Sequence, residues 1–281
     1  MKLIDIIHEK EKIAKEKYLE IESISYLVKN YFFSSPTEYY LALNQEFSEV
    51  DKLNELVDKY LFDLIPPQYI LGYTYFLNNK IMVNSDVLIP RRETEEVTLK
   101  AISLLDDINK LNLNVLDIAT GSGAIAIAIK KHFQDKMTDI NVSASDISTK
   151  ALEVAKKNAI INKVNIEFIE SDLFSNISGK YDLIISNPPY LDLLDCLHAH
   201  PLVTSNEPIS ALYAPDDGLY FYKKIIDEAP KYLKDSKYLV FEIGEKQLDK
   251  IVNYALAIYP NIYYRGFLDM EGKNRILVFK F

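Results

Sequence analysis

The sequence predicts an α/β protein in which a small helical bundle precedes a domain built around a mostly parallel sheet. The first 71 residues contain no glycine, and apolar residues such as Leu3, Ile6 and Ile7 recur there at helical spacing. From residue 93 onward, apolar runs typical of strands alternate with amphipathic stretches typical of helices. Such alternation is typical of a sheet covered by helices on both faces.

A pair of prolines and a predicted hairpin divide the chain into three parts. Pro66 and Pro67 end the last helix of the first part, because proline lacks an amide hydrogen and restricts the residue before it. Residues 73–92 hold two short apolar runs around the turn signal Asn78-Asn79, which predicts a β-hairpin. We therefore expect a helical domain at 1–72, a hairpin linker at 73–92 and the main domain at 93–281.

The main domain should contain seven strands with helices between most of them. The expected strands are residues 114–118, 141–145, 165–169, 181–186, 238–243, 262–267 and 275–279. The expected helices are residues 124–132, 150–158, 219–233 and 246–259. No helix separates the last two strands, so these should form an antiparallel hairpin.

Composition excludes several classes of protein. The 32 Lys and Arg against 41 Asp and Glu give a net charge of -9, which disfavours non-specific binding to nucleic acid or anionic membranes. The single cysteine, Cys196, cannot form an internal disulfide or a thiolate zinc cluster, and the four histidines show no ligand grouping. The sequence has no signal-peptide stretch and no apolar run long enough to span a membrane, so we expect a cytosolic protein without a metal.

A glycine turn follows the first expected strand of the main domain. The segment Ala119-Thr120-Gly121-Ser122-Gly123 leads from that strand directly into a helix. Glycine permits positive φ and close backbone approach, so a ligand can lie against the main chain near amides at the helix start. The spacing lacks the third glycine of a dinucleotide-binding turn, and Gly-x-Gly alone is weak evidence.

Acidic residues stand at the ends of three successive strands, and they favour a particular ligand. Asp146 is placed to accept hydrogen bonds from ribose hydroxyls, and Asp172 to line an adenine region. Asp117 could orient the turn or meet an ammonium group. A cationic ligand that carries a ribose but no phosphate suits this acidic rim, and S-adenosylmethionine is such a ligand. The alternative is that these residues only cap helices or turns.

The fourth strand ends in Asn187-Pro188-Pro189-Tyr190 on the same edge of the sheet. The two prolines remove two backbone donors, so the loop presents oxygen acceptors. An incoming NH2 group could donate one hydrogen to the Asn187 side chain and one to the Pro188 carbonyl, while Tyr190 packs over the flat group. The alternative is a rigid proline turn without chemistry.

A planar NH2 nitrogen is a poor nucleophile, because its lone pair is delocalised. Gripping both hydrogens would aim that lone pair at the methyl group of the sulfonium, so positioning and electrostatic preorganisation are the main requirements. We expect direct in-line transfer, without a metal or a covalent enzyme intermediate, and S-adenosylhomocysteine as product.

With these motifs, the chain resembles the release factor glutamine methyltransferases, also called HemK or PrmC, over nearly its whole length. The blocks that carry the resemblance are residues 67–72 (PQYILG), 87–95 (VLIPRRETE), 120–123 (TGSG), 146–148 (DIS), 186–190 (SNPPY), Glu207-Pro208, Ala211-Leu212, 217–219 (DGL), and 242–244 (EIG) with Gln247.

The resemblance implies a seven-stranded class I S-adenosylmethionine-dependent methyltransferase domain of Rossmann-like type, with the helical domain helping to hold the release factor. It implies methylation of the glutamine side-chain nitrogen in the Gly-Gly-Gln loop of class I release factors, by a monomer that binds neither nucleic acid nor membrane. The implied cofactor cradle comprises Asp117, Ala119 to Gly123, Asp146, Asp172, Leu173 and Asn187. The implied substrate site comprises Asn187 to Tyr190 with Arg91, Glu93 and Thr94, of which Asn187, Pro188 and Tyr190 are expected to be catalytic.

Two positions depart from the family pattern. Ala119 stands where a glycine is frequent, and Arg92 replaces a usual proline.

Two other functions remain open. One is a methyltransferase for DNA adenine or ribosomal guanine, which the negative charge and the absence of a target-recognition insertion disfavour. The other is a non-catalytic nucleotide-binding or assembly protein, which would not require Asn187. Arg91, Glu93 and Thr94 could also be no more than solvated caps.

Overall fold

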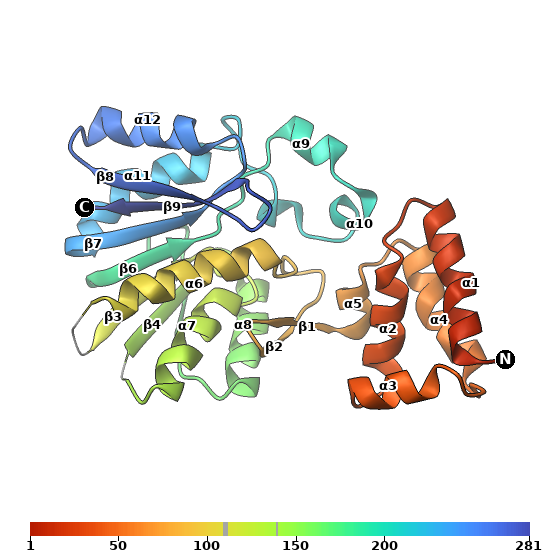
Figure 1. Cartoon of the computed structure of the whole chain (residues 1–281). Helices are drawn as coiled ribbons and strands as arrows, with labels where there is room; N and C mark the ends of the chain where they lie inside the picture. The colour runs from red at the N-terminus through yellow and green to blue at the C-terminus, as the bar shows by residue number, and fades with distance from the viewer. Residues whose placement is uncertain (109–111, 139) are drawn as a thin grey trace. The chain divides into compact units, whose positions relative to one another are not determined.

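The computed structural model describes residues 1–108, 112–138 and 140–281, apart from the side chain of Ser236. It divides into two compact units (Figure 1). The first comprises Met1–Tyr73 with His200–Asn206, and the second comprises Thr74–Ala199 with Glu207–Phe281. The hairpin thus belongs almost wholly to the second unit, and a short segment from late in the chain joins the first.

The first unit is the expected helical bundle. Its helices are α1 (Leu3–Glu16), α2 (Glu22–Phe32), α3 (Pro36–Ala42), α4 (Val50–Leu61), α5 (Pro67–Leu71) and α10 (Pro201–Thr204). Their apolar positions share one core that includes the fully buried Leu3, Leu27 and Leu53. The late segment is held here by Asn206, whose side-chain amide donates to the Leu64 carbonyl at 2.8 Å.

The expected hairpin is present as strands β1 (Tyr73–Phe76) and β2 (Asn79–Met82). Its turn lies on Leu77 and Asn78, which both have positive φ, one residue earlier than the sequence suggests. The buried Asn79 side chain explains the shift, because it donates to the carbonyls of Phe76 and Leu77 and so closes the turn from the first position of β2.

The second unit contains a seven-stranded sheet in the order β5-β4-β3-β6-β7-β9-β8. Its strands are β3 (Leu113–Ile118), β4 (Ile140–Asp146), β5 (Glu167–Glu170), β6 (Tyr181–Ser186), β7 (Leu233–Glu242), β8 (Tyr263–Leu268) and β9 (Asn274–Lys280). The first five are parallel, and β9 runs antiparallel to both β7 and β8. The predicted fold class, including the final hairpin, is confirmed.

Helices cover both faces of this sheet (Figure 1). One layer comprises α6 (Arg92–Asp106), α7 (Ala124–Asp135) and α8 (Thr149–Ile161), and the other comprises α11 (Tyr220–Tyr232) and α12 (Leu248–Ile258). The sequence did not predict α6, α9 (Leu193–His198), α10 or the turn η1 (Ile209–Ala211). No helix within the described residues is long and apolar enough to cross a membrane.

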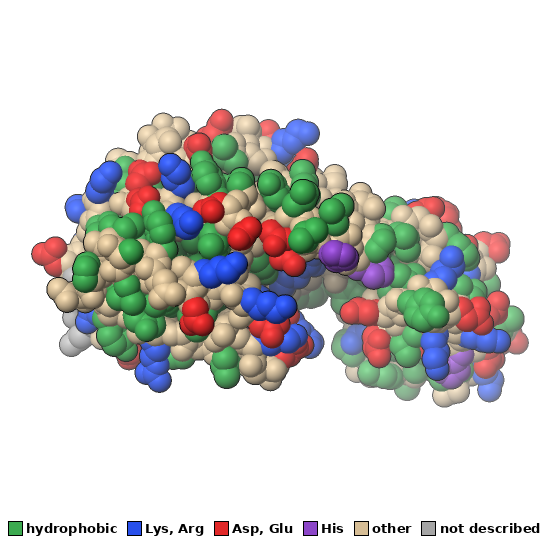
Figure 2. All heavy atoms as spheres, turned by 90° about the horizontal axis from the view of Figure 1, so that it is seen from above, with side chains coloured by type: hydrophobic (Ala, Val, Ile, Leu, Met, Phe, Trp, Pro, Cys, Tyr) green, Lys and Arg blue, Asp and Glu red, His purple; other side chains and the backbone are tan. Residues whose placement is uncertain are grey.

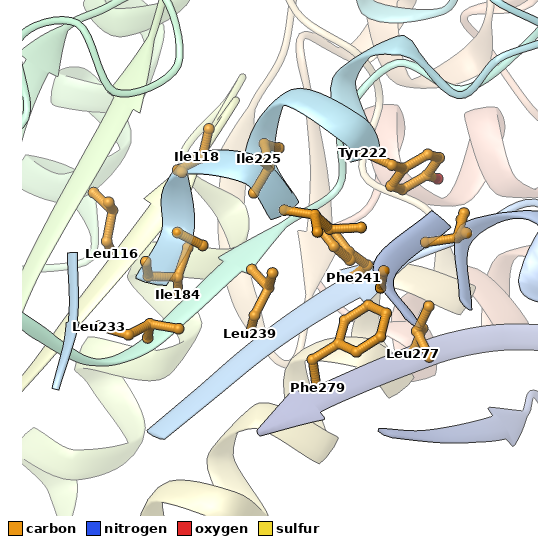
Figure 3. Close-up of a cluster of buried hydrophobic side chains, with 14 of the residues drawn as sticks. Leu116, Ile118, Ile184, Tyr222, Ile225, Leu233, Leu239, Phe241, Leu277 and Phe279 are labelled. Atoms are coloured by element: carbon orange, nitrogen blue, oxygen red, sulfur yellow. The ribbon is translucent and has the colours of Figure 1, made fainter. Parts of the chain in front are cut away.

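One buried core of the second unit lies between the sheet and α11, and its fully buried aromatic side chains include Phe174, Tyr222, Phe241 and Phe279. Figure 3 shows Leu116, Ile184, Leu239 and Leu277 from the strands in one cluster with Tyr222 and Ile225 of α11. Successive strand residues point to opposite faces, so a residue that follows a member of this core points toward α6 and α7 instead. This alternation determines where the two buried acids Asp117 and Glu242 point.

Candidate active site

A cavity of about 410 Å³ lies at the carboxyl ends of β3, β4 and β6. This is the edge at which open parallel sheets hold their ligands. Its walls come from six segments of the second unit, within residues 86–94, 118–125, 146–151, 171–173, 187–189 and 208–221. The walls are mainly apolar with a few polar groups, which is typical of a small-molecule site.

The glycine turn forms one wall, since Ala119, Thr120, Gly121 and Ser122 all line the cavity. Ala119 and Gly121 have positive φ, 59° and 54°, which turns the backbone under the cavity. Gly123 does not line it. At Gly123 a Cβ would lie 3.0 Å from the Cβ of Ala155, so this glycine allows α8 to pack closely on the turn.

Asp146 is held rigidly at the cavity wall. One of its carboxylate oxygens accepts the Gly121 amide at 2.8 Å, and the other accepts the Ser148 amide at 2.9 Å. Burial raises the pKa of this carboxyl, while these backbone amides act in the opposite direction. Each oxygen retains lone pairs that a bound ligand's hydroxyls can use.

Asp117 was expected in the cofactor cradle, but it does not line the cavity. Its side chain is fully buried and accepts the Thr120 hydroxyl at 2.5 Å. Burial raises its pKa to about 7, against the effect of that hydrogen bond. Of the two roles considered for Asp117, the structure favours orienting the turn over meeting a ligand's ammonium group.

Asp172 and Leu173 lie on the cavity wall after β5. Leu173 has a positive φ of 48°, and the neighbouring buried Ser171 donates its hydroxyl to the Leu173 carbonyl at 2.9 Å. This local hydrogen bond holds an otherwise disfavoured backbone conformation. The third acidic strand end is therefore at the same cavity as Asp146.

The residues of the loop after β6 lie partly at the cavity and partly against the core. Asn187, Pro188 and Pro189 line the cavity, and Tyr190 does not. The Tyr190 ring packs against the core, its hydroxyl lies 3.4 Å from Oε1 of Glu242, and its carbonyl accepts the side-chain amide of Gln247 at 2.9 Å. Burial raises the pKa of Tyr190 well above its usual value, so this phenol stays protonated. The expected packing of Tyr190 over a substrate amide is thus replaced by a supporting position.

Thr94 and Glu242 stand behind Asn187. The Thr94 hydroxyl, at the cavity wall, donates to Oε2 of Glu242 at 2.6 Å and accepts the Asn187 side-chain amide at 3.3 Å. Glu242 is 1% exposed, and burial raises its pKa to about 7 although Thr94 and the Arg275 charge act in the opposite direction. The sequence analysis named Glu242 only within a family block and gave it no role, although a carboxylate inside the apolar run that ends β7 was a signal.

Arg91 and Glu93 do not line the cavity. Arg91 instead forms an ion pair with the buried carboxylate of Glu207, whose other oxygen accepts the Ile89 amide at 3.0 Å. Glu207 thereby joins two walls, because Leu88 and Pro90 line the cavity on one side and Pro208 on the other. The sequence had flagged Glu207 only within a family block.

The remaining wall had no assigned role in the sequence analysis. It consists mainly of small or apolar side chains, which suit the flat faces of a ligand more than its charges: Pro208, Ser210, Ala211, Tyr213, Pro215 and Phe221. Within the part of the chain that the structure describes, no group of three or more His, Cys, Asp or Glu residues could hold a metal ion.

Solved structures with the same fold include other methyltransferases. A methyltransferase from Pyrococcus furiosus matches with a TM-score of 0.51 at 17% identity, over 82% of this chain and 95% of that one. The T. thermophilus 16S rRNA N2 G1207 methyltransferase, solved with AdoMet and guanosine, matches with a TM-score of 0.52 at 10% identity, over 74% of this chain and 49% of that one. At such identities the likeness shows the fold alone.

Sequence comparison identifies the family. The model described as Methyltransferase small domain matches residues 98–206. The chain is 38% identical to the release factor glutamine methyltransferase of Streptococcus pneumoniae, over 99% of this chain and 98% of that protein. It is 32% identical to that of Staphylococcus aureus over the same shares of both chains. The chain is therefore a methyltransferase and belongs to the release factor glutamine methyltransferase family.

Proposed function

We propose that this chain transfers the methyl group of S-adenosylmethionine to the side-chain nitrogen of the glutamine in the Gly-Gly-Gln motif of class I peptide chain release factors, and so modulates translation termination. The observation that carries the proposal is one cavity bounded by a glycine turn with Asp146 on one side and by Asn187-Pro188-Pro189 on the other. This arrangement puts a nucleoside site next to a carboxamide site.

The residues present fit S-adenosylmethionine. Asp146 offers two oriented oxygens to ribose hydroxyls, Ala119 to Ser122 offer backbone close to the ligand, and Asp172 and Leu173 border the far end. When bound, this cofactor supplies an electrophilic methyl group on a sulfonium.

On the substrate side, the Asn187 side-chain oxygen and the Pro188 carbonyl would each accept one hydrogen of the glutamine NH2 group. This grip orients the nitrogen lone pair and favours the positive charge that develops there as the N–C bond forms and the S–C bond breaks. One nitrogen proton then leaves to solvent. With its pKa raised, Tyr190 is no base, and its role is to support the loop.

Methylation of purified release factor tests this proposal. The enzyme is incubated with tritiated S-adenosylmethionine and either a release factor, the same factor with the motif glutamine replaced by alanine, or DNA and ribosomal RNA. We expect label only in the unmodified factor, with one added methyl group located on the Gly-Gly-Gln peptide by mass spectrometry. Label in nucleic acid alone would replace the proposal with a nucleobase methyltransferase, and label in none would favour a non-catalytic protein.

Cofactor binding is tested at Asp146. In Asp146→Asn one acceptor oxygen becomes an NH2 group, so we expect affinity for S-adenosylhomocysteine to fall about tenfold or more in isothermal titration. The matched control is Glu170→Gln, an exposed acid in β5 outside the cavity, which should bind as the wild type does. Equal affinity in both variants would show that Asp146 does not hold the ligand.

We further propose that the first unit contributes to release factor binding and that the protein acts as a monomer. It carries the exposed Tyr40 (63%) and Leu41 (67%) on α3, both of which could meet a protein partner. Changing both to serine should raise KM for the factor and leave cofactor affinity unchanged. Unchanged KM would remove α3 from the binding surface, and light scattering of the wild type checks the oligomeric state.

A further inference from the structure

Behind the cavity, a chain of three hydrogen-bonding side chains leads from the core to the carboxamide of Asn187. Glu242 lies at the end of β7, Thr94 in the first turn of α6 and Asn187 after β6. Thr94 connects the other two, at 2.6 Å to the glutamate and 3.3 Å to the asparagine. The function proposed above leaves Thr94 and Glu242 without a chemical role.

The glutamate is held in place from all sides. Phe241 points into the α11 core (Figure 3). Glu242 follows it in β7 and so points the other way, where it meets Thr94 of α6. The Tyr222 hydroxyl donates to the Glu242 carbonyl at 2.9 Å, and the Tyr190 hydroxyl faces its Oε1. The charged groups that act on it are Arg275 from β9 and Glu93 from α6.

These contacts decide which way the Asn187 carboxamide faces. An ionised Glu242 can only accept hydrogen bonds, so the single hydroxyl proton of Thr94 must be donated to it. Oγ1 of Thr94 then has only lone pairs to offer, and Asn187 must present its NH2 group to it. The carboxamide oxygen is thereby turned away from Thr94, to where a substrate NH2 group can donate to it. If the Asn187 carboxamide were turned the other way, its NH2 group would face the substrate NH2 group, and two donors would oppose each other.

We propose that Thr94 and Glu242 are positioning residues that hold the Asn187 side-chain oxygen toward the substrate, and that protonation of Glu242 releases this orientation. Once protonated, Glu242 can donate to Thr94, whose own proton is then free to turn to Asn187. The inference rests on the proposed function, because it assumes that Asn187 receives a substrate NH2 group. Burial places the pKa of Glu242 at about 7, so the change falls within an accessible pH range.

Two variants of Thr94 and a matched control isolate the hydroxyl. Thr94→Val keeps the shape and removes the hydroxyl, whereas Thr94→Ser keeps the hydroxyl. Thr98→Val makes the same change one turn later in α6, at a fully buried threonine whose hydroxyl donates only to the Thr94 carbonyl at 2.8 Å. We expect kcat for release factor methylation to fall about 10- to 100-fold in Thr94→Val, to recover largely in Thr94→Ser and to stay unchanged in Thr98→Val, with cofactor affinity unchanged throughout.

A second measurement is independent of the substrate. The side-chain NH2 signals of Asn187, assigned by their loss in Asn187→Asp, are followed by NMR as pH is varied. We expect them to titrate near pH 7 in the wild type and Thr98→Val, and not in Glu242→Gln or Thr94→Val. The inference is overturned if the Asn187 NH2 signals of the wild type do not shift with pH, or if they shift equally in Thr94→Val. If the wild type does not methylate a release factor at all, the proposed function fails while this titration still decides the positioning role.

Discussion

Ala119 has a backbone conformation that suits glycine better than alanine. Its φ is 59°, in the left-handed region, where a Cβ crowds the following carbonyl and costs about 1 kcal/mol or more. Ala119 stands where the family frequently has a glycine, and the positive φ gives that departure a physical cost. The neighbouring contact of the Thr120 amide with the Ser145 carbonyl at 2.9 Å helps to maintain the conformation.

We predict that Ala119→Gly stabilises the protein by up to about 1 kcal/mol, because relief of strain exceeds the added chain entropy of glycine. Urea unfolding measures the change. Ala126→Gly, in the interior of α7, serves as the control and should lose stability. If the two glycine variants are destabilised alike, Ala119 is not strained.

Gly218 supports the Asn-Pro-Pro-Tyr loop from outside the cavity. Its φ is 77°, and a Cβ there would collide with the carbonyl oxygen of Tyr190. The same carbonyl accepts the Gln247 side chain, so its position is fixed from two directions. Small size at Gly218 is therefore a requirement of the loop as much as of the local backbone.

We predict that Gly218→Ala lowers kcat at least tenfold, because the Tyr190 backbone must move and displace Asn187. Gly179→Ala is the matched control, since Gly179 also has positive φ (87°) but has no neighbour within 4 Å of a Cβ. Both variants should lose stability in urea because of the positive φ, and Gly218→Ala should lose more because of the added collision. Equal activity in the two variants would mean that the loop tolerates the collision.

Turning to whole elements, the hairpin, the glycine turn and α8 are connected by one side chain. Asn158 is fully buried, accepts the Met82 amide at 2.7 Å and donates to the carbonyls of Met82 and Ser122 at 3.0 Å and 2.9 Å. It thereby connects β2 to the cavity wall. From the sequence, Asn158 was only the last residue of an expected helix.

We predict that Asn158→Leu destabilises the protein by roughly 3 kcal/mol, because one buried and two part-buried hydrogen bonds to backbone groups are lost. Asn162→Ala is the control at the C-cap of α8, one turn later, where the side chain makes one exposed and one part-buried hydrogen bond, and it should cost below about 1 kcal/mol. Thermal unfolding compares the two. A small effect at Asn158 would show that water replaces its contacts.

For the molecule as a whole, the overall charge bears on the class of substrate more than any single ion pair does. On the face shown in Figure 2, Lys and Arg side chains lie among Asp and Glu side chains. Together with the net charge of -9, this favours a protein substrate over a nucleic acid. Two further acids, Asp117 and Glu242, are buried with pKa values raised to about 7.

These two acids predict a pH dependence of stability. Their folded pKa of about 7 lies above the ordinary values of 3.8 and 4.5, so between these values the folded state binds more protons than the unfolded state. Their contribution is full at low pH and is lost as pH rises through 7. We expect the free energy of unfolding to fall from about pH 5 to about pH 8.

Denaturant titrations at several pH values measure this slope. Glu242→Gln cannot ionise and should show a shallower fall, whereas the exposed Glu170→Gln should keep the wild-type slope. An identical slope in Glu242→Gln would mean that this carboxyl keeps an ordinary pKa in the folded protein.

Local patterns were sufficient for most of the fold and for part of the site. The strand at residues 181–186 was predicted to the residue, and the glycine turn, Asp146, Asp172 and the Asn-Pro-Pro loop were named from their places at strand ends. These residues line one cavity because the carboxyl ends of parallel strands share one edge of a sheet. Tyr190 and Arg91 were placed at the substrate from the same pattern, but the direction of a side chain is not contained in it.

The sequence by itself determined the order of the strands along the main domain, the edge that holds the cavity and the family. The tertiary structure decided which polar groups face that cavity. Asp117 and Glu242 lie in strands distant along the chain, and alternation points both away from the α11 core. Asp117 accepts the Thr120 hydroxyl only three residues on, whereas Glu242 accepts the hydroxyl of Thr94, which lies 148 residues earlier in the chain. The second pair depends on packing between elements, and no local periodicity records which partner such a buried carboxylate will meet.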